Sequence, residues 1–141
     1  MQEKVKSEMI SAMKSKDKER LSVLRLINGK LTDALKENSN TDLVAVLDSM
    51  VKERNKSIEA YTEGGRNDLA DQEKFEVTII NEFLPKRMSV EDIQEVAKTV
   101  ISELGASSMK DMGRVMGVLK GKLGNNAKPA DIASVVKSEL A

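Results

Sequence analysis

The chain has 141 residues, with 23 Lys and Arg against 23 Asp and Glu, and so a formal net charge of zero. It contains no Cys, no His and only 2% aromatic residues. These counts exclude disulfides, zinc–thiolate sites, His-based catalytic triads and base stacking on aromatic platforms. Zero net charge argues against a general nucleic-acid coat but leaves room for a local basic patch.

The periodicity of apolar residues predicts an all-α fold, because Ala, Leu, Lys, Glu and Met dominate and no stretch alternates with a period of two. Seven helices are expected at about 2–14, 18–37, 42–63, 68–83, 90–104, 109–121 and 129–140. The expected N-caps are Asp17, Thr41, Asn67, Ser89 and Ser108, the last two in capping boxes with Asp92 and Asp111. Pro129 is expected as the first residue of the last helix.

Residues 85–88 form the best domain boundary, since Pro85 stops the fourth helix and the chain beyond is richer in Gly and Ser. We therefore expect an N-terminal domain at 1–88, a bundle of about four helices arranged in hairpins. A small three-helix domain is expected at 89–141. The N-terminus lacks an apolar signal segment and no stretch resembles a membrane span, so a cytoplasmic protein without membrane contact is expected.

Three charged residues interrupt apolar faces in the helices on either side of Gly64 and Gly65. Arg54 falls within the apolar face of residues 42–63, and Glu73 and Glu76 fall within that of residues 68–83. Counting the same number of residues in each direction from the turn at Gly64 and Gly65 brings Arg54 opposite Glu76 or Glu73. Paired carboxylates can perform acid–base chemistry, but an ion pair can equally fix helix register. We favour the structural interpretation, because no nucleophile, metal-ligand set or phosphate loop accompanies the carboxylates.

The helix expected at 109–121 has an apolar stripe and a second face that carries three glycines. That face combines small residues with cations, and the cations continue beyond the helix. Its residues, with the neighbouring cations, are Lys110, Gly113, Arg114, Gly117, Lys120, Gly121, Lys122 and Lys128. Each interior Gly costs roughly 0.5–1 kcal/mol relative to Ala, so three on one face need a reason. We favour close helix–helix packing, and approach of a phosphate backbone is the alternative.

The order and spacing of several motifs resemble those of the YqeY-like proteins. The motifs are KDKERLSVLR at 16–25, GGRNDLA at 64–70, FLP at 83–85 and GASSMKDMGRVMG at 105–117. MGRVMGVLKGK at 112–122 and NAKP at 126–129 are also similar to the tail domain of GatB, a subunit of glutamine-dependent aspartyl/glutamyl-tRNA amidotransferase. That tail is a small helical module that helps to hold tRNA.

The resemblance implies a tRNA-related accessory module with a three-helix tail of the GatB/YqeY type. It implies tRNA as a partner, together with an aminoacyl-tRNA synthetase or an amidotransferase subunit. It assigns the cationic glycine face to nucleic acid. Homology also suggests the label of a carbon–nitrogen ligase that uses glutamine as amido-N-donor. No residues here match either active site of the amidotransferase, so we expect no catalytic residues, no cofactor and no metal.

A protein-interaction module without nucleic-acid affinity is the alternative function. It is suggested by the zero net charge, the scarcity of aromatic residues and the eight methionines. Methionine-rich surfaces adapt to varied partners, although most methionines fill cores.

Overall fold

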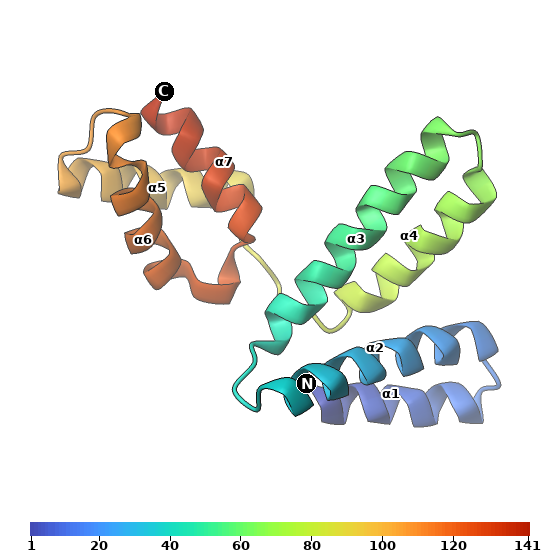
Figure 1. The fold of residues 1–141 in the computed structure, drawn as a ribbon. Helices are drawn as coiled ribbons and strands as arrows, with labels where there is room; N and C mark the ends of the chain where they lie inside the picture. Colours follow the sequence, from blue (N-terminus) through green and yellow to red (C-terminus); the bar gives the residue numbers. More distant parts are fainter. The chain divides into compact units, whose positions relative to one another are not determined.

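The computed structural model describes residues 1–141, which form two compact units, Met1–Leu84 and Pro85–Ala141. The all-α prediction is confirmed: the chain contains seven α-helices, two short 3₁₀ helices and no strand (Figure 1). None of the helices combines the length and the hydropathy that crossing a bilayer requires.

The first unit consists of two antiparallel hairpins. Its helices are α1 (Gln2–Lys14), α2 (Lys18–Glu37), α3 (Leu43–Glu63) and α4 (Asn67–Asn81). Helix α2 packs against α1 and also contacts α3 and α4, so it connects the two hairpins. The hairpins meet at one end and diverge toward the α3–α4 turn (Figure 1). The shared core is aliphatic apart from Phe83, and its largest fully buried members are Leu24, Ile27, Leu31, Leu47 and Ile80.

The second unit packs three helices around its own core. It comprises α5 (Val90–Leu104), the 3₁₀ turn Met109–Asp111, α6 (Met112–Leu123), the 3₁₀ turn Gly124–Asn126 and α7 (Pro129–Leu140). Each helix contributes fully buried aliphatic side chains, among them Ile93, Val100, Val115, Leu119 and Val136. The Met88 amide donates to the Asn126 carbonyl at 2.7 Å, and the Met88 side chain packs on this core. Residues 85–88 therefore belong to the second unit, four residues earlier than the boundary expected from sequence.

Local sequence signals account for several helix ends. The Asp17 carboxylate accepts from the Arg20 amide at 3.1 Å, and the Ser89 hydroxyl accepts from the Asp92 amide at 3.2 Å, so both predicted N-caps are confirmed. Gly105 ends α5 in the left-handed conformation, with φ of 65°, which glycine adopts without steric cost. Pro129 is the first residue of α7, as predicted.

Three predicted caps are wrong. Asp42 caps α3, because the Thr41 hydroxyl instead donates to the Asn38 and Ala34 carbonyls. Asn67 is already helical, and Arg66 precedes it without a side-chain cap. At the third site Ser108 makes no side-chain cap, and Asp111 accepts the Ser107 amide at 3.0 Å.

Two predicted ends also shift. Helix α4 ends at Asn81, before the turn that leads to Pro85. Helix α6 starts at Met112, after the 3₁₀ turn, and continues through Gly121 to Leu123. It ends at Gly124, whose φ of 51° breaks the helical path.

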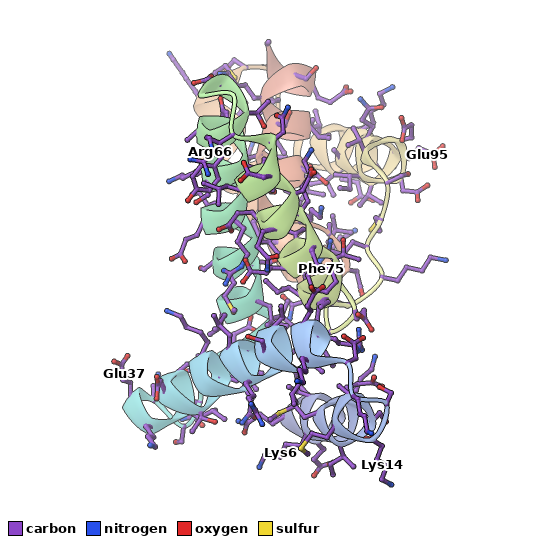
Figure 2. The ribbon with its side chains drawn as sticks, turned by 90° about the vertical axis from the view of Figure 1, so that its right-hand side faces the viewer. Lys6, Lys14, Glu37, Arg66, Phe75 and Glu95 are labelled. Carbon is purple, nitrogen blue, oxygen red and sulfur yellow. The ribbon has the colours of Figure 1, made fainter.

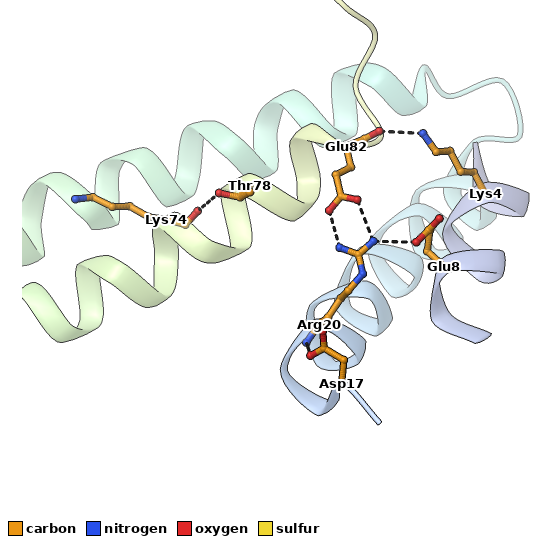
Figure 3. A network of polar contacts seen from close by, with 7 residues as sticks. All are labelled: Lys4, Glu8, Asp17, Arg20, Lys74, Thr78 and Glu82. Carbon is orange, nitrogen blue, oxygen red and sulfur yellow. Dashed lines mark hydrogen bonds and ion pairs between the residues drawn. The ribbon is translucent and has the colours of Figure 1, made fainter. Parts of the chain in front are cut away.

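The Arg20 guanidinium joins three segments of the first unit (Figure 3). Its two terminal nitrogens contact both oxygens of Glu82, just after α4, at 2.6 and 2.9 Å, and Nη2 also reaches Glu8 on α1 at 2.9 Å. Lys4 adds a bond to the Glu82 carbonyl at 3.1 Å and lies 5.5 Å from the centre of the Phe83 ring. Sequence analysis gave no sign of this network, because its members are far apart in the chain.

Replacing Arg20 by Ala should lower the free energy of unfolding by about 1–3 kcal/mol at pH 7, since charge-assisted hydrogen bonds contribute this much and partial exposure weakens them. The hydrogen bond from Arg20 lowers the pKa of Glu82. Because the pKa of Glu82 is lower in the folded than in the unfolded state, the carboxylate stabilises the fold at pH values above its unfolded-state pKa of about 4.3. This contribution is lost as the pH falls through the folded-state pKa. The gap between wild type and Arg20→Ala in urea unfolding should therefore close in acid. Arg25→Ala, an exposed control on α2, should change stability by less than about 0.5 kcal/mol.

Lys16, in the α1–α2 turn, is the one non-glycine residue with positive φ, at 60°. A residue with a side chain in this conformation costs roughly 1–2 kcal/mol. Glycine removes this strain, but it loses more backbone entropy on folding, which offsets part of the gain. Lys16→Gly should therefore raise the free energy of unfolding by about 0.5–1 kcal/mol in thermal or urea denaturation. Lys6→Gly, at an exposed position in the interior of α1, should lower the free energy of unfolding by a similar amount. A loss of stability in Lys16→Gly would contradict the assignment of strain to this turn.

Candidate nucleic-acid interface

Helix α6 turns one side to the core of the second unit and the other to solvent. Val115, Leu119 and Leu123 are buried against α5 and α7. All eight residues assigned to nucleic acid by sequence are exposed: Lys110, Gly113, Arg114, Gly117, Lys120, Gly121, Lys122 and Lys128. The structure therefore leaves the whole candidate set accessible on one small unit.

The three glycines form a narrow arc on the outer side of α6. At about 100° per residue, Gly113, Gly117 and Gly121 span roughly 80°. Lys120 lies about 20° outside one edge of this arc, and Arg114 lies about 20° outside the other. Lys122 falls about 100° beyond Gly121, nearer the apolar side. The glycine arc is thus flanked by Lys120 and Arg114, and Lys122 stands apart from it.

No other part of the second unit packs against the glycine arc. A Cβ built on Gly113, Gly117 or Gly121 would meet no atom within 4 Å. Close packing of these glycines within the chain, which we favoured from the sequence, is therefore wrong. Each glycine lowers helix stability by about 1 kcal/mol relative to Ala without an internal contact in return.

Charge on this surface is strongly positive. Residues 110–128 hold five cations and one carboxylate, a net charge of +4. Arg114 Nη2 lies 3.2 Å from Asp111, whose pKa is lowered by the Ser107 amide and further by Arg114. The other four cations form no ion pair or hydrogen bond through their ammonium groups: Lys110, Lys120, Lys122 and Lys128. One anchored guanidinium and four free ammonium groups suit a phosphate backbone.

Helix α5 carries the opposite charge. Its exposed carboxylates are Glu91, Asp92, Glu95 and Glu103, against the single cation Lys98. Figure 2 shows Glu95 pointing outward from α5. A polyanion approaching the second unit is therefore attracted to α6 and repelled by α5, which restricts its orientation.

The charged residues singled out in the first unit lie between α3 and α4. Arg54 Nη2 is 3.8 Å from Glu76 Oε1, and the two side chains are 12% and 15% exposed. Arg54 also donates to the Met50 carbonyl at 3.1 Å, while its Nε is buried without a partner. Glu73 forms no ion pair with Arg54, but its charge acts on Glu76.

Burial raises the pKa of Glu76, the attraction of Arg54 opposes this without cancelling it, and Glu73 adds to the rise. A long ion-pair contact of this kind compensates poorly for removing a carboxylate from water. The arrangement offers no nucleophile, and no three His, Cys, Asp or Glu side chains in the chain converge on a common point.

A groove that sequence analysis missed opens between α2 and α4, and it includes Glu76. It has a volume of about 300 Å³, is open to solvent, and is lined by Lys18, Glu19, Ser22, Val23, Leu26, Gln72 and Glu76. Leu26 is 40% exposed and lies on the wall of the groove. Its exposure depends on how the two hairpins diverge, which no local pattern reports.

Arg54→Met should lower the free energy of unfolding by about 1–3 kcal/mol at pH 7, less than for a fully buried pair, because it leaves Glu76 without a cation. A raised folded-state pKa stabilises the fold at low pH, and this contribution is lost as pH rises through the folded value. The deficit should therefore shrink toward about pH 4. The double variant Arg54→Met/Glu76→Leu should recover wild-type stability or exceed it in urea unfolding. A double variant as unstable as Arg54→Met would show that the pair itself stabilises the hairpin.

Comparison with known proteins identifies relatives of this chain and a family that matches nearly its whole length. Two curated fungal relatives are similar to it. An uncharacterized protein of Schizosaccharomyces pombe is 27% identical over 93 residues, which cover 63% of this chain and 76% of that protein. The "Altered inheritance of mitochondria protein 41, mitochondrial" of Pyrenophora tritici-repentis is 25% identical over 128 residues, covering 84% of this chain and 71% of that protein. The sequence profile of the Yqey-like protein family matches residues 2–140, and the chain therefore belongs to the YqeY-like family.

Proposed function

We propose that the chain is an accessory tRNA-binding module that supports a tRNA-modifying or aminoacylating enzyme. The observation that carries the proposal is the open cationic arc of α6, where three glycines without internal contacts are flanked by Arg114 and Lys120. A helix face without side chains lets a phosphate backbone come close to the flanking cations. The similarity of residues 112–122 and 126–129 to the GatB tail supports tRNA as the nucleic acid.

The module acts by binding and not by chemistry of its own. Homology would label it a carbon–nitrogen ligase with glutamine as amido-N-donor, yet the ligase centre would belong to its partner. An aminoacyl-tRNA synthetase or an amidotransferase subunit is the partner class that fits. The cytoplasm remains the expected compartment, although the Pyrenophora relative is named as mitochondrial. Glutamine-dependent ammonia release by the purified chain would contradict a purely accessory role.

The alternative is a protein-interaction module without affinity for nucleic acid. The observation that favours it is the groove between α2 and α4, with Leu26 exposed on its wall. The two functions use different units of the chain and are separable by mutation.

The salt dependence of tRNA binding tests the first function. The triple variant Arg114→Ala/Lys120→Ala/Lys122→Ala should bind total tRNA more weakly than wild type. The slope of log K against log salt should flatten by about 0.7–0.9 for each phosphate that the variant no longer neutralises. A matched triple variant of exposed lysines in the first unit, Lys30, Lys52 and Lys56, leaves the overall charge change the same and should keep the wild-type slope. Equal slopes for wild type and the α6 variant would remove the site assignment.

A second variant separates close approach from simple charge attraction. Gly117→Leu fills the open arc while it retains every cation. Because a side chain there meets no atom within 4 Å, the substitution should stabilise α6 by about 0.5–1 kcal/mol. It should nevertheless weaken tRNA binding at every salt concentration. Unchanged binding would show that the glycine arc takes no part.

A further inference from the structure

The groove between α2 and α4 is formed by two helix ridges that face each other. Lys18, Ser22 and Leu26 recur every fourth residue along α2, over about 12 Å of helix, and Gln72 and Glu76 do so on α4. Val23, which is 4% exposed, forms its floor and belongs to the core. Two such ridges with a gap between them accommodate the ridge of a third helix. A volume of about 300 Å³ holds side chains of such a helix and little more.

The groove has a distinct chemical character. Leu26 offers apolar surface, while Glu19 and Glu76 offer carboxylates, and Glu73 adds negative charge next to Glu76. Glu19 is exposed and has no ion pair, and Glu76 has only the distant guanidinium of Arg54 at 3.8 Å. Lys18 is the single cation on the lining. With Glu73 and Arg54 included, three carboxylates face two cations, and the resulting net charge of −1 favours a cation in the groove.

Glu76 costs stability in the free chain, because burial raises its pKa despite Arg54. A cation brought into the groove would relieve this cost. An arginine suits the position better than a lysine, because its guanidinium is weakly hydrated and binds a carboxylate through two parallel hydrogen bonds. The aliphatic stem of that arginine would lie along Leu26.

We propose that the α2–α4 groove docks a helix of a partner protein that places an aliphatic residue on Leu26 and an arginine on Glu76. The contact covers about two turns of α2, and Glu19 provides a second carboxylate for a basic residue at the outer end. This surface lies in the first unit and is independent of the proposed tRNA face on α6.

A defined peptide pair tests the proposal with the full-length chain. The probe is an alanine-based helical peptide of about 15 residues, with Leu and Arg four positions apart. The control peptide carries Gln in place of Arg. Titration of the ¹⁵N-labelled chain should shift amide signals around Ser22, Leu26, Gln72 and Glu76. The arginine peptide should bind roughly 5–10-fold more tightly than the glutamine peptide, about 1–1.4 kcal/mol.

Variants of the chain locate the contact. Glu76→Gln should abolish the preference for arginine, whereas Glu53→Gln, an exposed site on α3, should keep it. Leu26→Ser should weaken binding of both peptides. If circular dichroism shows that Glu76→Gln is misfolded, Glu19→Gln serves in its place, because Glu19 is exposed, and it should reduce the preference.

Three results would overturn the proposal. Equal affinity for the two peptides would remove the role of the carboxylates, and shifts outside the groove would remove the site. Sedimentation that shows self-association, abolished in Glu76→Gln, would assign the groove to a second copy of the chain. Displacement of the peptide by tRNA at the same residues would assign it to RNA. Arg114→Ala should leave peptide affinity unchanged, which separates this inference from the proposed tRNA function.

Discussion

One guanidinium, that of Arg20, connects three segments of the first unit that are far apart in the sequence. The core of this unit is almost wholly aliphatic, α1 packs mainly on α2, and α2 provides the contacts to the second hairpin. Arg20 connects Glu8 on α1 to Glu82 after α4, and hydrogen bonding to Glu82 and Glu8 raises its own pKa further. Because the bonds are bidentate and directional, they restrain the angle between the hairpins. The groove between α2 and α4 lies between these two hairpins.

Helices were predictable because their determinants are local. Apolar spacing located all seven, and Asp17, Ser89 and Pro129 fixed their starts through atoms within three residues. The errors arose where two adjacent residues compete. Thr41 and Asp42 can both cap α3, and the Ala34 and Asn38 carbonyls, supplied by the end of α2 and the loop after it, decide between them by engaging the Thr41 hydroxyl.

The environment of the candidate sites could be predicted only in part, because it depends on tertiary packing. Counting from a turn gave the facing positions of Arg54 and Glu76, since a hairpin fixes register, but it gave no measure of the burial that raises the pKa of Glu76. On α6 the spacing of Gly113, Gly117 and Gly121 placed them on one face. Whether another helix covers that face is a property of tertiary packing, and here none does. No local pattern signals the role of Arg20, because its partner Glu82 is 62 residues away in the chain.

Two features of this chain lower its stability without an internal benefit: open glycines inside α6 and a half-buried carboxylate on α4. Sequences usually agree with their fold at every level, so departures that nothing in the fold explains concentrate at functional sites. The two departures lie in surroundings of opposite charge. The glycine arc lies among cations and suits an anionic ligand, whereas Glu76, with Glu73 beside it and Arg54 at 3.8 Å, suits a cationic one. Under the two proposals, a chain with zero net charge presents an anion-binding face on one unit and a cation-binding groove on the other.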